Sequence, residues 1–293
     1  MRIRLPSLLR IISVFILLTA SVKTVSAQVR SGNDNGKNEQ RAVEMEKAVR
    51  AIEESYYTGK GKEFDVTALK AGSLEDIVSS LDEESRIIDR KPSSLGFVRG
   101  LEEEGTIARA ELLERDFNYI GYMRLKYFSR RTNRDFKNAM GNLGDMDGFI
   151  LDLRDNPGGF LQSALDVLGN FISGGKLLLT EVRRKGSEQH FAHTRALPTL
   201  TEDIPIVVLI NASTASSAEI VAATLRHYRD AVIVGQKSHG KGTIQDVIPL
   251  SAKKTLILTT GEYILADGSS FRDSGIVPDR LVEGEREQFE TAV

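Results

Sequence analysis

The sequence contains no cysteine. A disulfide framework, a cysteine metal site and a thiol nucleophile are therefore all excluded. The sequence also lacks a large net charge of either sign. Its 39 basic and 41 acidic side chains give a formal net charge of −2 at pH 7. Domains that bind nucleic acid are usually strongly basic, so no nucleic-acid partner is expected. With 293 residues, 41% of them hydrophobic, the chain has enough apolar material for one large core or two smaller ones.

The N-terminal segment, residues 1–27, has the layout of a secretory signal peptide. Arg2, Arg4 and Arg10 form a positive region, an apolar stretch follows over 11–22, and small residues end the segment. The apolar stretch is shorter than the roughly 20 residues that a membrane-spanning helix needs. We therefore expect an exported protein, periplasmic or secreted. An uncleaved segment that tethers the protein to a membrane is the alternative.

The next part of the chain is expected to be a linker and then helices. Residues 28–40 are polar and rich in Gly and Asn, which predicts a disordered linker. An N-terminal helical region is expected over 41–90. Within it, apolar residues at helical spacing predict one helix from Arg41 to about Tyr57 and a second over 66–81.

From residue 119 onward, short apolar runs alternate with helical patterns. The alternation predicts an α/β (α+β) layer structure around a largely buried sheet. The expected strands cover 119–125, 148–153, 206–210, 231–235 and 255–263. The expected helices cover 133–143, 161–171 and 218–227.

The first candidate site is the segment 152–159, Asp-Leu-Arg-Asp-Asn-Pro-Gly-Gly. Here a buried strand enters a turn and then a helix. Gly158 and Gly159 permit a backbone conformation that would strain other residues, and they can expose N–H groups beside a helix N-terminus. Such N–H groups can stabilise an oxyanion. The alternative is an ordinary turn between a strand and a helix.

The second candidate site is the segment 211–219, Asn-Ala-Ser-Thr-Ala-Ser-Ser-Ala-Glu, between a buried strand and a helix. Its small residues allow a ligand to approach closely. A serine in this position would be presented at the carboxyl end of the strand. The alternative is that these hydroxyls cap the following helix.

The third candidate site is the segment 238–245, Ser-His-Gly-Lys-Gly-Thr-Ile-Gln. Lys241 lies between two glycines, which let the backbone turn its side chain inward. A buried lysine gives up its charge more readily, and the neutral amine can then activate a serine hydroxyl. The alternative is a surface turn with a solvated lysine. A Walker-type phosphate loop fits poorly, because the required Gly and Ser/Thr spacing is missing.

Together, these segments resemble the carboxyl-terminal processing peptidases, the tail-specific protease family with a Ser–Lys catalytic dyad. The segment 152–159 is very close to the family signature. Gly240-Lys241-Gly242 with Gln245, and the Gly-Ile-Val-Pro-Asp of 275–279, are also similar to family motifs. The resemblance covers most of the mature sequence. It implies a ClpP/crotonase-like peptidase core over 119–293, preceded by an N-terminal helical segment.

The resemblance also implies roles for individual residues. The family nucleophile stands three places before the motif's glutamate, and this selects Ser216 because Glu219 fills the glutamate position. The general base falls on Lys241. Gln245 matches the residue that orients this lysine.

The implied activity is that of a serine-type peptidase working through an acyl-enzyme. The oxyanion hole would use backbone N–H groups of Ser217 and of Gly158 or Gly159. No metal or organic cofactor is implied. Polypeptides are the expected substrates.

The sequence departs from the family pattern in two places. An aspartate found in many members, eleven residues after the nucleophile, is His227 here. The family usually carries a PDZ domain before the core, but here only the connector 91–118 stands in its place. This is shorter than the roughly 50 residues of an independent domain. We therefore expect a member without a PDZ domain. An adaptor protein and a homo-oligomer formed through the N-terminal helices remain open as partners.

Three other interpretations compete with the dyad. A Ser-His-Asp triad would need a histidine such as His239, but no Gly-x-Ser-x-Gly elbow is present. His190 and His193 could suggest a metal pair, although no acidic motif accompanies them. The third interpretation is a non-catalytic ligand- or peptide-binding protein built on a peptidase-like core.

Overall fold

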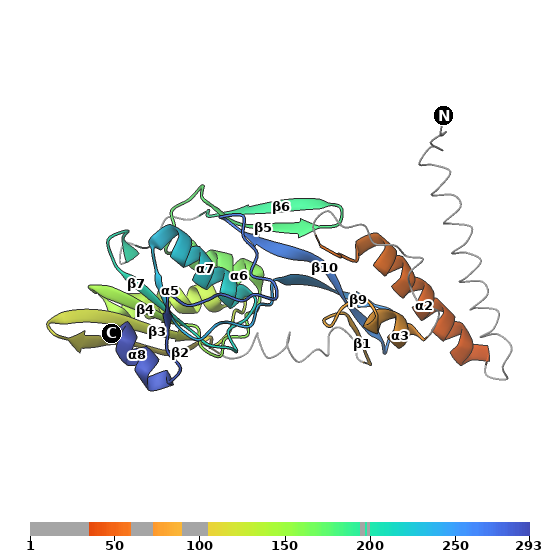
Figure 1. Ribbon diagram of the computed structural model, residues 1–293, viewed down its shortest axis with the longest axis horizontal. Coiled ribbons are helices and arrows are strands. Elements are labelled where there is room, and N and C mark those ends of the chain that lie inside the picture. Colours follow the sequence, from red (N-terminus) through yellow and green to blue (C-terminus); the bar gives the residue numbers. More distant parts are fainter. Residues whose placement is uncertain (1–34, 60–72, 90–104, 194–196, 198–199) are drawn as a thin grey trace, which may run out of the picture. The chain divides into compact units, whose positions relative to one another are not determined.

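The computed structural model describes all residues except 1–34, 60–72, 90–104, 194–196 and 198–199 (Figure 1). The predicted signal peptide therefore lies outside the described residues. The chain divides into two compact units. Of the described residues, the first unit holds 35–56, 73–89 and 245–259, and the second unit holds the rest.

The first unit is built mainly from two helices and a small antiparallel pairing. Helix α2 (Asn35–Ser55) and the short helix α3 (Leu74–Ser79) contribute to one apolar cluster with Leu250, Leu256 and Leu258. Strand β1 (Arg86–Ile88) pairs antiparallel with the first part of β10 (Thr255–Leu265). This cluster gives the unit its own hydrophobic core.

The helices of this unit differ in their bounds from the prediction. Helix α2 begins at Asn35 rather than Arg41, so 35–40 are helical and not part of a disordered linker. Lys, Glu and Gln in this stretch are good helix formers, which offsets the glycine and asparagines. In α3, the Ser73 hydroxyl accepts the Asp76 N–H while the Asp76 carboxylate accepts the Ser73 N–H. This capping box starts the helix at Leu74, and residues 66–72 of the predicted helix lie outside the described residues.

The second unit contains a six-stranded sheet of order β11-β8-β7-β4-β3-β2. Strands β3, β4, β7, β8 and β11 run parallel, and only β2 is antiparallel to its neighbour. The strand bounds are β2 Ile107–Arg115, β3 Asn118–Leu125, β4 Gly148–Asp152, β7 Ile206–Ile210, β8 Val232–Gly235 and β11 Arg280–Leu281. The predicted α/β fold with a largely buried sheet is confirmed.

Each face of this sheet is covered by helices. Alternate residues of a strand point to opposite faces. Met123 and Leu151 therefore join the large core with α5 (Thr132–Leu143), α6 (Leu161–Leu168) and α7 (Ser217–Arg229). Tyr122 and Ile150 point to the other face, where the helix α8 (Glu285–Ala292) packs through Phe289 and Ala292 (Figure 1). The two-sided burial explains why the central strands are continuous apolar runs.

Several elements of the second unit were not predicted. The predicted connector 91–118 is wrong in its second half, because 107–115 form β2 at the edge of the sheet. Its sequence, Ile-Ala-Arg-Ala-Glu-Leu-Leu-Glu-Arg, carries charges on both faces, as exposed edge strands often do. The hairpin of β5 (Leu177–Arg183) and β6 (Gly186–Phe191) also escaped prediction, as did α8. The remaining strand is β9 (Thr243–Pro249), which was also not predicted.

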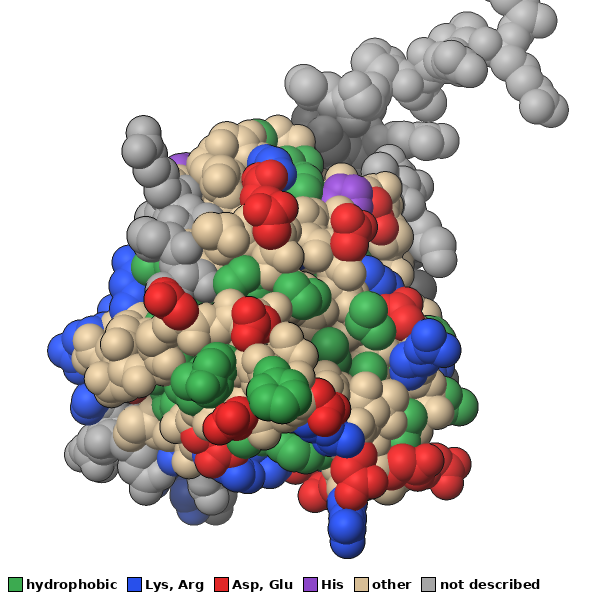
Figure 2. Space-filling view, turned by 90° about the vertical axis from the view of Figure 1, so that its left-hand side faces the viewer, with side chains coloured by type: hydrophobic (Ala, Val, Ile, Leu, Met, Phe, Trp, Pro, Cys, Tyr) green, Lys and Arg blue, Asp and Glu red, His purple; other side chains and the backbone are tan. Residues whose placement is uncertain are grey.

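The surface is mixed in character. On the face shown in Figure 2, small apolar patches are separated by acidic and basic side chains, as on an ordinary solvated surface. Among the described residues, no helix combines the length and apolar character needed to cross a bilayer.

Candidate active site

The three candidate segments follow three neighbouring parallel strands. The segment 153–160 follows β4, the segment 211–216 follows β7, and the segment 236–242 follows β8. Carboxyl ends of parallel strands meet at one edge of a sheet, which is where α/β proteins usually bind ligands. Ala215 donates its N–H to the Asn156 carbonyl at 3.0 Å, and His239 donates its N–H to the Thr214 carbonyl at 3.0 Å. All three segments are therefore in direct contact.

The Gly158-Gly159 turn packs against the serine segment. Gly158 has a φ of 92° and Gly159 a φ of 145°, both in the region that favours glycine. A Cβ on Gly158 would lie 2.9 Å from the Ser216 Cβ and 2.8 Å from the Ala215 carbonyl oxygen. A Cβ on Gly159 would collide with the backbone carbonyl of Phe128. The paired glycines are thus required for the close approach of the turn to the serine.

Replacing Gly159 by alanine is expected to destabilise the protein strongly, because the new Cβ meets backbone atoms that cannot move independently. We expect a loss of at least about 3 kcal/mol in the free energy of unfolding, measured by urea denaturation. Gly141→Ala is the matched control. Gly141 lies inside α5 with nothing within 4 Å of an added Cβ. That variant should gain roughly 0.5–1 kcal/mol. Equal stability of the two variants would contradict the close packing at Gly159.

Asn156 holds the turn in place, although the sequence analysis gave it no role. Its side chain is fully buried. The Nδ2 group donates to the Leu125 carbonyl at 2.9 Å, and Oδ1 accepts the Gly158 N–H at 2.9 Å. The sequence did hold one sign of this role, namely an asparagine placed just before the paired glycines. A buried side-chain amide needs several hydrogen-bond partners, and the backbone of such a turn can supply them.

Ser216 occupies the position just before α7. Its backbone has a φ of 56° and a ψ of −121°, which is unusual for a residue other than glycine. Such conformations are strained by about 1–3 kcal/mol and cluster at functional sites. Ser216 is half-buried, whereas Ser213 is exposed and Ser217 is buried with its hydroxyl donating to the Gly159 carbonyl at 3.0 Å. Of these three serines, Ser216 alone combines a strained backbone with partial access to solvent.

Glu219 connects the serine to the lysine. The side chain is fully buried. Its Oε2 accepts the Ser216 N–H at 2.8 Å and the Lys241 N–H at 2.9 Å. Its Oε1 accepts the Ser238 hydroxyl at 2.5 Å and the Gly240 N–H at 2.7 Å. One carboxylate oxygen therefore contacts the backbone nitrogens of both proposed dyad members. From the sequence alone, Glu219 served only to select Ser216, because contacts between distant segments are not visible there.

The lysine segment is supported from its other side by residues 271–276. Asp273 donates its N–H to the Gly240 carbonyl at 2.9 Å, and Ile276 donates its N–H to the Ser238 hydroxyl at 2.6 Å. Gly275 has a φ of 63°, and a Cβ there would collide with the Ser238 carbonyl. This contact gives a physical reason for glycine at the start of the segment 275–279. Lys241 itself is half-buried.

The structure brings the two residues together through their backbones. Within the described part of the chain, no direct hydrogen bond joins the Ser216 hydroxyl to the Lys241 amine. Catalytic hydrogen bonds are often long or misaligned before substrate binds.

Backbone donors lie beside the serine. Gly158 directs its N–H to Asn156 Oδ1. Among the described residues, the N–H groups of Gly159 and Ser217 have no hydrogen-bond acceptor.

Gln245 belongs to the first unit. Its side-chain amide donates to the Glu84 carbonyl and to the Glu84 carboxylate, at 3.3 Å in each case. The predicted orientation of Lys241 by Gln245 stays a prediction.

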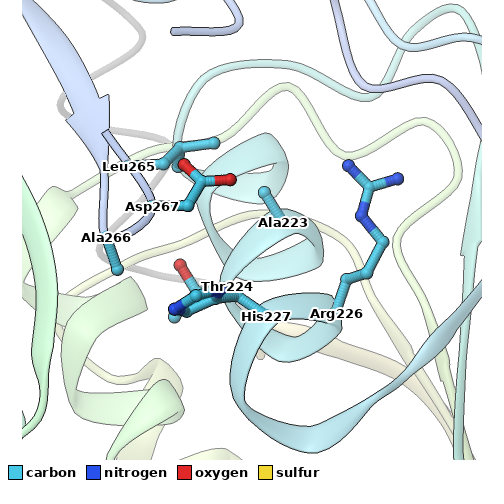
Figure 3. A pocket seen from close by; sticks show the side chains of 7 residues that line it. All are labelled: Ala223, Thr224, Arg226, His227, Leu265, Ala266 and Asp267. Atoms are coloured by element: carbon cyan, nitrogen blue, oxygen red, sulfur yellow. The ribbon is translucent and has the colours of Figure 1, made fainter. Parts of the chain in front are cut away.

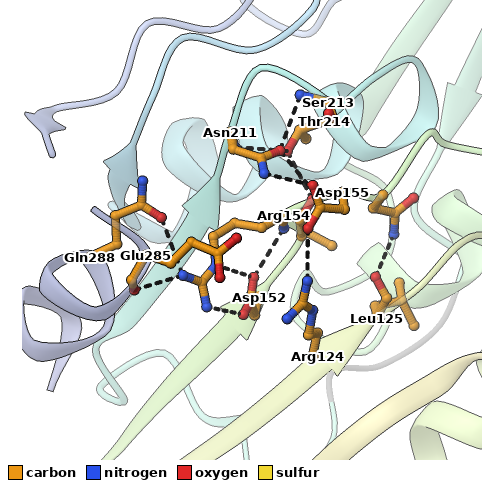
Figure 4. A network of polar contacts seen from close by, with 12 residues as sticks. Arg124, Leu125, Asp152, Arg154, Asp155, Asn211, Ser213, Thr214, Glu285 and Gln288 are labelled. Atoms are coloured by element: carbon orange, nitrogen blue, oxygen red, sulfur yellow. Dashed lines mark hydrogen bonds and ion pairs between the residues drawn. The ribbon is translucent and has the colours of Figure 1, made fainter. Parts of the chain in front are cut away.

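A buried polar network supports the strand end beneath the turn (Figure 4). Asp152 and Arg154 form an ion pair of 2.5 Å, and Arg154 also donates to the Glu285 carbonyl at 2.9 Å and to the Gln288 side chain at 3.2 Å. Burial and a 2.7 Å hydrogen bond to Asp152 raise the pKa of the Tyr122 phenol well above its usual range. The network ties the β4 end to α8.

Further polar residues, only one of which (Asp155) is exposed, flank the same strand ends (Figure 4). The Asp155 carboxylate accepts hydrogen bonds from Arg124 Nη2 and from Asn211 Nδ2, each at 2.8 Å. Thr214 donates its hydroxyl to the Leu153 carbonyl at 2.8 Å. These contacts hold the serine segment alongside the glycine segment.

The structure gives no support to the alternative of a metal pair at His190 and His193. His190 lies on β6, not on a helix, and its ring Nε2 faces Glu181 Oε1 at 3.2 Å. Among the described residues, no three or more His, Cys, Asp or Glu side chains form a group that could hold a metal ion.

The second unit thus has the fold of an α/β peptidase core. The family model of peptidase family S41 matches residues 119–282, which is more than half of the chain, and the chain belongs to this family. The resemblance to carboxyl-terminal processing peptidases is also confirmed.

Three comparisons illustrate this similarity. A carboxy-terminal-processing protease of Bartonella bacilliformis is 39% identical over 170 residues, covering 56% of this chain and 39% of that protein. A carboxyl-terminal-processing protease of Synechocystis sp. is 36% identical over 166 residues, covering 56% of this chain and 38% of that protein. The solved structure of a photosystem II D1 C-terminal processing protease has 28% identity and a TM-score of 0.51, covering 57% of this chain and 43% of that chain. The chain thus matches about two fifths of the length of these relatives.

Proposed function

We propose that the protein is an exported serine endopeptidase that hydrolyses polypeptides with a dyad of Ser216 and Lys241. The observation that carries this proposal is the Glu219 Oε2 atom, which accepts the backbone N–H groups of both residues. Membership of peptidase family S41 supports peptide bonds as the target. The basic and apolar pattern of residues 1–27 supports export.

In the first half of the reaction, the neutral amine of Lys241 accepts the proton of the Ser216 hydroxyl while Oγ attacks the peptide carbonyl carbon. The carbonyl oxygen becomes an oxyanion and accepts hydrogen bonds from the N–H groups of Ser217 and Gly159. The carbon–nitrogen bond then breaks, and the leaving amine takes the proton from the Lys241 ammonium. An ester on Ser216 remains.

In the second half, water attacks the ester carbonyl. Lys241 accepts the proton of the water, and the same backbone donors hold the new oxyanion. Collapse returns the proton to Ser216 Oγ and releases the new carboxyl terminus. The cycle needs no electron transfer and leaves the enzyme unchanged.

Neighbouring residues keep these groups in position. We assign Gln245 to the orientation of the Lys241 amine and Gly158 to the shape of the turn, since the Gly158 N–H is engaged by Asn156. Polypeptides would reach the core without a PDZ domain, either directly or through an adaptor. In this proposal, a signal segment over 1–27 and the N-terminal helical region precede that core.

The test is incubation of the protein with β-casein, an unfolded secreted polypeptide, and identification of the products by mass spectrometry. The wild type should generate peptides with new internal ends, and Ser216→Ala should generate none. Intact β-casein with both proteins would favour the alternative, a non-catalytic binding protein. Equal cleavage by both proteins would exclude Ser216 as the nucleophile.

A further inference from the structure

Asn156 joins three backbone segments beside the proposed oxyanion donors, and its side chain is fully buried. Its Nδ2 group donates to the Leu125 carbonyl, at the end of β3, at 2.9 Å (Figure 4). Its Oδ1 atom accepts the Gly158 N–H at 2.9 Å. Its backbone carbonyl accepts the N–H of Ala215, the residue before Ser216, at 3.0 Å. This one residue therefore fixes both the glycine turn and the serine segment against the end of β3.

The Asn156 amide also decides which N–H group of the turn is engaged. The Gly158 N–H is directed to Oδ1, while the Gly158 carbonyl accepts the Phe128 N–H at 2.9 Å. The next residue, Gly159, faces the serine segment, because its carbonyl accepts the Ser217 hydroxyl at 3.0 Å. In the part of the chain that is described, the Gly159 N–H makes no hydrogen bond. The two glycines of the turn thus differ in how their N–H groups are used.

His227, which departs from the family pattern, has no comparable position. It is exposed and lines a separate pocket of about 180 Å³ between the second half of α7 and the end of β10 (Figure 3). None of the residues that line this pocket belongs to the three candidate segments. Of the two residues, Asn156 is therefore the one that contacts the glycine turn.

We propose that Asn156 is a positioning residue for the proposed peptidase reaction, and this inference rests on that reaction. Its side-chain amide holds the turn so that the Gly159 N–H completes the oxyanion hole with the Ser217 N–H, while the Gly158 N–H is kept out of the hole. An oxyanion donor must lie about 2.7–3.1 Å from the developing charge, and the loss of one donor lowers the turnover number by about 10²–10³-fold. A displacement of the turn by about 1 Å is therefore costly.

Asn156→Asp tests this role with almost no change of shape. An ionised aspartate accepts hydrogen bonds but cannot donate one, so the bond to the Leu125 carbonyl is lost and two oxygen atoms face each other. The substrate is a fluorogenic peptide from a mapped β-casein cleavage site. At pH 8 we expect the turnover number to fall by at least about a hundredfold. The Michaelis constant should change by less than about threefold, because the oxyanion forms only after substrate has bound.

Lowering the pH should rescue this variant. A protonated aspartate carries one donor and can also accept, so it reproduces both hydrogen bonds of the amide, and burial raises the pKa of a carboxyl group. The ratio of the turnover numbers of Asn156→Asp and wild type should therefore increase by at least about tenfold between pH 8 and pH 5. The nearby ion pairs, Asp155 with Arg124 and Asp152 with Arg154, are common to both proteins and cancel in the ratio. A constant ratio would contradict the proposal.

Asn170→Asp is the matched control. Asn170 is also a buried asparagine, and its Nδ2 group donates to the Val167 carbonyl at 3.0 Å, at the end of α6. This variant should lose stability as Asn156→Asp does but should keep its turnover number. Unchanged turnover in Asn156→Asp, or an equal loss in both variants, would overturn the positioning role. A wild type without any peptidase activity would instead refute the proposed function, and the inference would fail with it.

A second measurement needs no variant and does not depend on the folding of one. A peptide boronic acid forms a bond between boron and the Ser216 oxygen, the displaced proton goes to the base, and the tetrahedral anion imitates the reaction intermediate. In amide NMR spectra of the wild type, we expect the N–H signals of Gly159 and Ser217 to shift downfield in this adduct while that of Gly158 stays in place. A shift of Gly158 without one of Gly159 would overturn the proposal.

Discussion

Replacing Lys241 by methionine is expected to reduce the turnover number for peptide hydrolysis by at least about a thousandfold. General-base catalysis contributes roughly 10²–10⁴-fold, and a serine hydroxyl is a poor nucleophile without it. Methionine keeps the length and apolar stem of the side chain. The backbone N–H of residue 241 can still donate to Glu219, so the segment should keep its conformation. Thermal unfolding should therefore change by only a few degrees.

Lys237→Met is the matched control for this experiment. Lys237 is exposed and lies four residues earlier in the same segment. It should retain full activity, because it takes no part in the contacts that hold the dyad. The assignment of the base is contradicted if Lys241→Met retains activity within tenfold of the wild type, measured by initial rates on a fluorogenic peptide derived from a mapped cleavage site.

Replacing Glu219 by glutamine is expected to impair both stability and catalysis. Glutamine can accept at its carbonyl oxygen, but its amide nitrogen must then face the other pair of donors. At least one of the N–H groups of Ser216, Gly240 and Lys241 loses its acceptor. We expect a loss of about 2–4 kcal/mol in the free energy of unfolding, measured by urea denaturation. Turnover should fall by about a hundredfold, because Ser216 and Lys241, the two proposed catalytic residues, lose their shared anchor.

Glu188→Gln makes the same chemical change at an exposed position on β6 and should alter neither quantity measurably. Since Glu219 acts through its neighbours, the Michaelis constant of Glu219→Gln should change far less than its turnover number. Normal turnover together with normal stability in Glu219→Gln would show that this carboxylate does not position the dyad.

Strands were easiest to predict from the sequence where both faces of the sheet are buried. The central strands β4, β7 and β8 are short runs of apolar residues, and these runs were recognised because both faces of the sheet are covered. Edge elements escaped because their pattern is weaker. Strand β2 has charged residues on both faces. Helix α8 depends on Arg154 and Tyr122, which lie more than a hundred residues earlier in the chain.

The candidate site shows a similar division. Local chemistry was sufficient to identify a serine turn, a lysine between glycines and a paired-glycine turn. The contacts that organise them were not visible, because hydrogen bonds such as those of Glu219 and Asn156 join segments that are distant in sequence. A buried acid at the first turn of α7 was compatible with ordinary helix capping. Only the fold shows that it also holds the lysine segment.

The central claim is that Ser216, and no neighbouring serine, is the nucleophile. The most direct measurement compares β-casein cleavage by three variants, Ser213→Ala, Ser216→Ala and Ser217→Ala, with quantified products by mass spectrometry. The structure places these hydroxyls in different surroundings, so the variants separate local disturbance from loss of the nucleophile. We predict that Ser216→Ala alone eliminates all internal cleavage while the other two variants retain measurable activity. Cleavage that persists in Ser216→Ala, or that disappears only in Ser213→Ala or Ser217→Ala, would contradict the assignment.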